Sequence, residues 1–189
     1  GGMLGVKTLS ELCGREVHYV QQPHDVDYLY DNYFKEDKLI QILDYKTPEK
    51  SPGEDTESFV NHISKKYGIP TTQHIVKYRG PEHSQWEEFL SGITDSLYCF
   101  NLDTVRSGGS MAVQCAALGI INVGGVQDSN EILFPSLATN DLNQLEDIFK
   151  TIHNDSDKRE DVIQTAFNKA RSHYSHDAVR ERFLGVVNG

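Results

Sequence analysis

Apolar residues along this 189-residue chain fall into two alternating patterns. Short runs rich in branched and aromatic residues are typical of buried strands. Between them lie longer segments in which apolar residues recur every three or four positions, which is typical of helices. The short runs predict strands at residues 17–20, 39–43, 74–78, 97–102 and 120–123, with a weaker sixth strand near Leu137.

The helical segments follow the strands with few exceptions. Strands separated by helices need crossover connections, which are right-handed and join parallel strands. The pattern therefore predicts an α/β fold: a Rossmann-like, doubly wound, mainly parallel sheet with helices on both faces and a helical C-terminal tail. The predicted buried helix faces are Phe59, Val60, Ile63 and Tyr67; Trp86, Phe89, Leu90 and Ile93; Leu142, Leu145, Ile148, Phe149 and Ile152; and Val162, Ile163, Ala166, Phe167 and Ala170.

Two parts of the chain are expected to differ in role. Gly1 and Gly2 precede Met3, so residues 1–37 are interpreted as a tag remnant followed by a linker or edge segment. Residues 38–189 are expected to form the Rossmann-like domain together with its C-terminal helices.

Composition narrows the class of protein. With 38% hydrophobic and 24% charged residues, the chain is expected to be a soluble globular protein. No apolar run approaches the roughly 20 residues that a membrane-spanning helix needs. Of the three cysteines, Cys99 and Cys115 lie in apolar stretches, which favours reduced thiols and a cytoplasmic location. The net charge of −10 makes nucleic acid an unexpected partner.

A small anion is still an acceptable ligand, because ligands of such sheets bind beyond the carboxyl ends of the strands, where helices begin. The most distinctive segment there is SGGSMAVQCAALGIINVGG, which runs from Ser107 to Gly125. Free N–H groups at the start of its helix favour a phosphate, although serine and glycine also begin helices that bind nothing. The candidate phosphate contacts are Arg106, Ser107, Gly108, Gly109 and Ser110.

Two other loops carry polar groups at the same edge. Lys46 and Lys50 follow the strand at 39–43 and could reach a phosphate, or they could be solvated surface lysines. Gln127 and Asp128 could hydrogen-bond the hydroxyl groups of a sugar. Alternatively, residues 124–131 form a solvated turn in which Asp128 or Ser129 caps a helix.

Several kinds of catalytic site are not supported by the sequence. His173 and His176 lack the spacing and the acidic or cysteine partners of a zinc site, so no metal is predicted. Neither G-x-S-x-G, H-E-x-x-H nor a complete G-x-x-x-x-G-K-[ST] motif occurs. The sequence assigns no catalytic residue and no cofactor.

Taken in order, these segments resemble the carboxyl-terminal half of GT-B glycosyltransferases, which are enzymes of two Rossmann domains that use nucleotide sugars. The resemblance rests on LIQILDYKTPEK at residues 39–50, on the strand at 97–102 with the glycine-containing segment after it, and on the tail FNKARSHYSHDAVRERFL. It covers roughly residues 38–184. Gly119 matches the glycine that ends the central helix, and Lys50 matches a lysine that contacts the donor diphosphate.

The resemblance implies a donor-binding domain that transfers a hexose from a nucleotide diphosphate sugar to an unknown acceptor. Lys46, Lys50 and residues 107–110 would hold the diphosphate, Gln114 the ribose, and Gln127 with Asp128 the sugar. An N-terminal acceptor-binding domain would be its partner, so this chain would be incomplete as an enzyme. Many retaining members carry two glutamates eight positions apart, where this sequence has Arg106 and Gln114.

Two alternatives stay open at this point. A sugar-nucleotide epimerase of related fold would also use the Gly-Gly-Ser loop. A non-enzymatic Rossmann-like interaction domain would need the loops only for packing.

Overall fold

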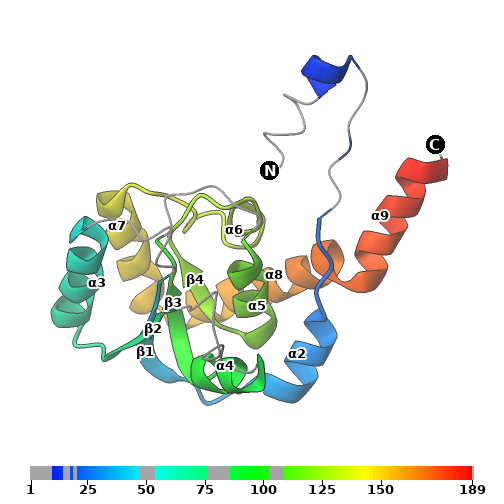
Figure 1. Ribbon diagram of the computed structural model, residues 1–189. Helices are drawn as coiled ribbons and strands as arrows, with labels where there is room; N and C mark the ends of the chain where they lie inside the picture. Colours follow the sequence, from blue (N-terminus) through cyan, green and yellow to red (C-terminus); the bar gives the residue numbers. More distant parts are fainter. Residues whose placement is uncertain are drawn as a thin grey trace.

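A computed structural model gives the arrangement of the chain (Figure 1), and it describes residues 10–14, 18, 21–46, 54–75, 86–102 and 109–188. The strands are β1 (Leu39–Lys46), β2 (Thr71–Ile75), β3 (Ser96–Phe100) and β4 (Ile121–Val123). The helices are α2 (Val26–Tyr33), α3 (Glu54–Tyr67), α4 (Trp86–Ile93), α5 (Ser110–Leu118), α6 (Asp128–Leu133), α7 (Leu142–His153), α8 (Ser156–Tyr174) and α9 (His176–Asn188).

All strand pairs in the described sheet are parallel, and the spatial order is β2-β1-β3-β4. The register places Ile42 of β1 beside Thr71 of β2 and Tyr98 of β3, and Tyr98 in turn beside Ile121 of β4. The predicted α/β fold with a parallel sheet, helices on both faces and a helical tail is confirmed.

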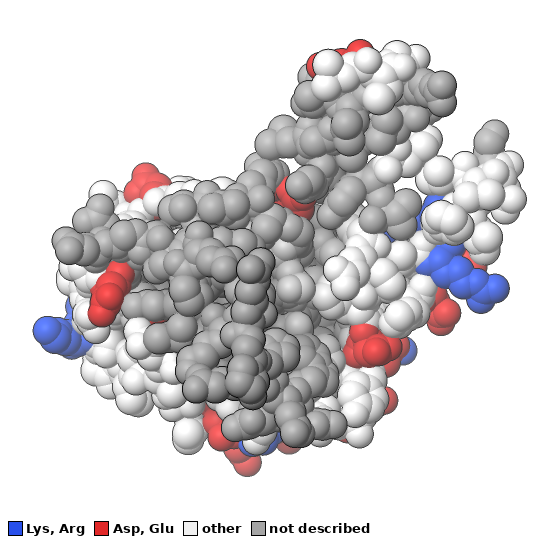
Figure 2. All heavy atoms as spheres, viewed as in Figure 1, with Lys and Arg blue, Asp and Glu red and all other residues white. Residues whose placement is uncertain are grey.

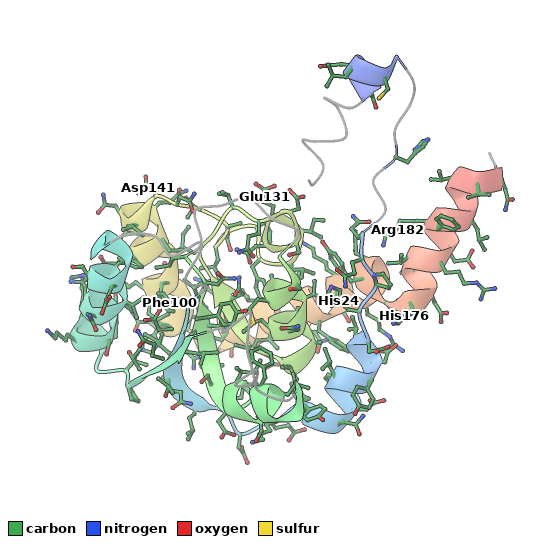
Figure 3. All side chains as sticks on the ribbon, viewed as in Figure 1. His24, Phe100, Glu131, Asp141, His176 and Arg182 are labelled. Atoms are coloured by element: carbon green, nitrogen blue, oxygen red, sulfur yellow. The ribbon has the colours of Figure 1, made fainter. Side chains whose placement is uncertain are left out.

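One face of the sheet is covered by α3 and α7 through aromatic packing. Phe149 of α7 lies with its ring centroid 4.9 Å from that of Tyr98 and 5.5 Å from that of Phe100. Phe59 and Tyr67 of α3 join the same cluster, at 6.3 Å from Phe100 and 5.5 Å from Phe149 respectively. Figure 3 shows Phe100 enclosed between the strands and these helices.

The opposite face is covered by α5, which is buried on almost every side by the sheet, α2, α6 and α8. Tyr30 of α2 packs on Phe167 of α8, with 4.5 Å between ring centroids. The segment before α2 is also held against α8 by a hydrogen bond, in which the His24 N–H donates to the Tyr174 carbonyl at 2.7 Å. In Figure 1, α9 then extends away from the body of the molecule.

The helix α2 is a feature that the sequence analysis missed. Val26 and Leu29 are buried, and together with Tyr30 and Tyr33 they have the three- and four-residue spacing of a helix face. This signal is present in the sequence, but the prediction for residues 1–37 gives only a linker or edge segment with a strand at 17–20.

The predicted sixth strand near Leu137 is wrong. The Leu137 N–H donates to the Phe134 carbonyl at 2.9 Å, which closes a tight turn, and Pro135 inside that turn has no N–H for a strand ladder. The Leu137 side chain is fully buried, so its hydrophobic position serves the core without belonging to a strand.

Two other predicted strands differ from the structure in extent or lie partly outside the described residues. The strand expected at 74–78 begins at Thr71, because β2 is an edge strand in the described sheet and its Thr-Thr-Gln start is polar and exposed. Residues 76–78 lie outside the described residues, and so does the strand expected at 17–20 apart from His18. None of the described helices is long and apolar enough to cross a membrane.

The aromatic cluster under α7 predicts a large loss of stability on truncation. Phe149→Ala should lower the free energy of unfolding by about 3–5 kcal/mol, because a fully enclosed ring is replaced by a cavity. The matched change Phe183→Ala removes a ring that is 53% exposed and should alter it by less than about 0.5 kcal/mol. Urea denaturation followed by circular dichroism measures both, and equal losses would contradict this description of the core.

Candidate functional site

The order of the strands marks one position at the carboxyl edge of the sheet. From β1 the chain moves outward to β2, then returns across β1 to form β3 and β4, so its direction reverses between β1 and β3. In doubly wound sheets the crevice at this reversal is where ligands bind. Lys46 ends β1 there, and Asn101 directly follows β3.

The helix α5 begins at the same edge. Its N-cap is Gly109, with a φ angle of +72°, and its first residue, Ser110, is exposed. In its first turn the Ala112 N–H donates to the Gly109 carbonyl at 3.0 Å, which leaves the N–H groups of Ser110 and Met111 for a ligand. The helix dipole gives this end a partial positive charge. Seven of the nine residues of α5 are buried, so the position of this end is fixed by the core.

Close contact with α6 fixes the N-cap as well. A Cβ atom on Gly109 would lie 2.2 Å from the Ser129 Oγ and 2.8 Å from the Gln127 Oε1. The Ser129 hydroxyl donates a hydrogen bond to the Gly109 carbonyl. Glycine is therefore needed at position 109 for two reasons: the backbone is left-handed, and a side chain there would collide with α6.

The loop between β4 and α6 is organised by a buried polar network. Asn130 donates from Nδ2 to the Gly124 and Gly125 carbonyls, at 2.7 and 3.0 Å, and its Oδ1 accepts from Asn122 at 2.9 Å. Gly124 has a φ angle of +87°, and a Cβ atom there would lie 2.2 Å from Leu102. The Gly-Gly pair is thus explained by backbone conformation and close packing.

The alternative of a solvated turn at residues 124–131 is wrong, because Gly124, Gly125 and residues 127–130 are all buried. The suggested cap is also different. Gln127 is the N-cap of α6 and no side chain caps the helix, while the Ser129 hydroxyl is used to bond Gly109 instead.

Asn101 is the least satisfied polar group in this region. Its side chain is 1% exposed, and its Nδ2 lies 3.4 Å from the Gln127 Oε1, which is a long hydrogen bond. No described residue donates a hydrogen bond to its Oδ1. Buried polar atoms rarely lack a hydrogen-bond partner, so this oxygen is suited to a donor group that the described residues do not supply.

The structure brings part of the predicted site together. Gly109 and Gln127 are in direct proximity, Ser110 starts α5, and Asp128 starts α6 beside Gln127. Figure 3 labels Glu131 of α6 and Asp141 before α7, both at this upper edge of the molecule. Asp141 has a structural role there, since its carboxylate accepts from the N–H groups of Asn143 and Gln144.

Gln114 lies apart from this group. It is half-buried on the side of α5 that faces α2, where it lines a cavity of about 350 Å³ with residues of the segment before α2 and with His176 of α9. In Figure 3 the labelled His24 and His176 mark this cavity between α2 and α9, and the His176 Nε2 lies 3.0 Å from the Asp25 carboxylate.

The remaining predicted residues stay predictions. Lys46 is placed at the end of β1 by its backbone, but its side chain is not described. Lys50, Arg106, Ser107 and Gly108 lie outside the described residues.

The Cys99 thiol behind the site is not suited to nucleophilic chemistry. Burial, with added effects from Cys115 and the Asp44 carboxylate, raises the pKa of the Cys99 thiol well above its usual range. The thiol therefore stays protonated at neutral pH. Within the described part of the chain, no three His, Cys, Asp or Glu side chains are grouped so that they could hold a metal ion.

Sequence analysis gave no role in the site to Asn101, Asn122 or Asn130, and it considered Ser129 only as a helix cap. A signal existed for Asn101 and Asn122, because Asn101 directly follows the apolar strand β3 and Asn122 lies inside the apolar strand β4, where a hydrophobic residue would otherwise be expected. No sequence pattern distinguishes the bonding partners of the other two.

Two solved glycosyltransferase structures share this fold. One is an alpha-glucosyltransferase in complex with UDP, with a TM-score of 0.64 and 12% identity; the match covers 90% of this chain and 57% of that chain. The other is an alpha-glucosyltransferase in complex with UDP and a 13-mer DNA containing an HMU base. Its TM-score is 0.61 with 13% identity, and the match covers 96% of this chain and 61% of that chain.

The predicted likeness to a GT-B glycosyltransferase is thereby confirmed at the level of the fold. This chain spans about three fifths of the length of each of these proteins. No protein-family model matches the sequence, and no curated protein matches it either.

The junction of α5 with α6 predicts a strong position dependence of glycine substitution. Gly109→Ala should lower the free energy of unfolding by about 1–3 kcal/mol, because the new methyl group meets Ser129 and the backbone is left-handed. Gly92→Ala, in α4, meets nothing within 4 Å and should be neutral or stabilise the helix by up to about 1 kcal/mol. Urea denaturation of both variants checks this, and a neutral Gly109→Ala would show that the junction is looser than described.

Proposed function

We propose that this chain is the nucleotide-sugar-binding domain of a glycosyltransferase. One observation carries the proposal: the start of α5 lies at the sheet edge where the strand order reverses, near the buried Asn101 amide oxygen, to which no described residue donates. The first-turn N–H groups suit an anionic phosphate, and an amide oxygen suits a hydroxyl or N–H group. A nucleotide sugar offers both kinds of group within one molecule. The shared fold with two UDP-bound glucosyltransferases supports this class of ligand and makes UDP the first to test.

The proposed reaction is displacement at the anomeric carbon of the sugar. The diphosphate leaves, and its developing charge is stabilised by the N–H groups of α5 with Lys46, Lys50 and Arg106. These groups stabilise a leaving diphosphate without calling on a metal ion. The proposal assigns no acid or base in this chain, and it places acceptor binding in a further domain, in line with the greater length of the structural neighbours.

The nature of the acceptor is not part of this proposal. One structural neighbour was solved with DNA, whereas the net charge of −10 here opposes binding to a phosphate polymer. On the face shown in Figure 2, the described basic side chains are scattered, with the larger groups near α3 and near α9, and they form no continuous basic surface. That nucleic acid is not a partner stays a prediction.

Binding of a nucleotide should be visible as thermal stabilisation. At a UDP concentration about 100 times Kd, the folded state gains about 2.7 kcal/mol, which raises Tm by roughly 5–10 °C for a domain of this size. Differential scanning fluorimetry with UDP, UDP-glucose, GDP, ADP and CMP measures the shift and ranks the bases.

The variant Lys50→Ala should lose most of this shift, because a charge partner of the diphosphate is removed. Lys65→Ala is the matched control, since Lys65 is an exposed lysine of α3, and it should keep the full shift. Absence of any shift at millimolar nucleotide would overturn the proposed function. A full shift in Lys50→Ala would show that the diphosphate lies elsewhere.

A further inference from the structure

Asn101 has the properties of a residue that recognises a ligand. It follows β3 at the reversal of strand order, and its N–H donates to the Val123 carbonyl at 3.0 Å, so its backbone is held by the sheet. Its side chain is 1% exposed, yet its Oδ1 accepts from no described residue. A buried acceptor left without a donor costs free energy, which a bound ligand with a donor group would recover.

The contacts of Asn101 place its carboxamide near the start of α5. The Asn101 Nδ2 lies 3.4 Å from the Gln127 Oε1, and that same oxygen lies 2.8 Å from the position that a Cβ atom of Gly109 would take. The unpartnered oxygen therefore belongs to the same small region as the first-turn N–H groups of α5. The helix end offers donors, and Asn101 offers an acceptor.

This combination selects a ligand that carries an oxyanion close to a hydroxyl group. The ionised diphosphate of a nucleotide sugar has no donor for the Asn101 oxygen, whereas the attached sugar supplies hydroxyl groups that can donate. Asn101 is bonded to Gln127 at the start of α6. The sugar hydroxyl group that donates to the Asn101 oxygen therefore lies on the α6 side of the diphosphate. The predicted contacts of Gln127 and Asp128 put the transferred sugar on that side.

We propose that Asn101 is a specificity-determining residue, whose Oδ1 accepts a hydrogen bond from one hydroxyl group of the transferred hexose. This inference rests on the proposed function and adds to it a residue and a contact. The long bond from Asn101 to Gln127 holds the carboxamide in one orientation, so that the oxygen is presented to the sugar. Gln127 thereby acts as a positioning residue.

The test compares UDP-glucose with its four monodeoxy analogues, lacking the 2-, 3-, 4- or 6-hydroxyl group of the hexose, by isothermal titration calorimetry. The wild-type protein should bind one analogue about tenfold more weakly than UDP-glucose, because the buried oxygen loses its donor. In Asn101→Leu this penalty should fall to less than about twofold, and the affinity for UDP alone should stay within about twofold of wild type.

Two further variants keep the test decisive. Asn101→Asp retains an acceptor oxygen in the same place, and the Gln127 amide can turn its Nε2 toward the carboxylate, which cannot donate to Oε1. This variant should retain the penalty for the same analogue, even if its charge weakens every ligand equally. Asn168→Leu makes the matched change at an exposed position of α8 and should behave as wild type. If Asn101→Leu does not fold, the wild type and Asn101→Asp still report the contact.

The outcomes separate the two claims. If the wild-type protein binds neither UDP nor UDP-glucose, the proposed function fails, and this inference fails with it. If it binds both but tolerates all four analogues, or if Asn101→Leu keeps the penalty, only the role of Asn101 is overturned. A penalty for 2′-deoxy-UDP that disappears in Asn101→Leu would move the contact to the ribose and would likewise overturn the assignment to the hexose.

Discussion

The close contact between Gly109 and the start of α6 is the constraint on which the candidate site depends. With no side chain at Gly109, the Gln127 and Ser129 side chains come within contact distance of the α5 N-cap, and the Ser129 hydroxyl bonds the Gly109 carbonyl. This contact brings the positive end of one helix and the polar start of another to the same edge of the sheet. A longer residue at position 109 would separate them.

The reversal of strand order makes this contact relevant to ligand binding. A polar junction between two helices is only packing if it lies over the middle of a sheet. Here it lies next to Asn101, which directly follows β3, and the strand order reverses between β3 and its neighbour β1. On the other face of the sheet, the buried aromatic cluster around Phe149 packs on Tyr98 and Phe100 of β3.

Much of this architecture was predictable from the sequence, because it depends on hydrophobic periodicity. The apolar strands and the helix faces of α3, α7 and α8 follow directly from that pattern. The prediction of a strand was wrong at Leu137, where an apolar residue packs into the core from a turn. The predicted start of β2 was also wrong, because this edge strand begins with polar residues from Thr71. The helix α2 was missed even though Val26 and Leu29 showed the correct spacing.

The site was less predictable than the fold. Gly109 and Gln127 were expected from sequence, but the bond between Ser129 and Gly109 and the unpartnered Asn101 oxygen depend on three-dimensional proximity between separate loops. The most direct measurement is a crystal structure of the protein with UDP-glucose. The account predicts a diphosphate oxygen within hydrogen-bond distance of the first-turn N–H groups of α5, and a hexose hydroxyl on the Asn101 Oδ1. A nucleotide bound elsewhere on the chain would contradict it.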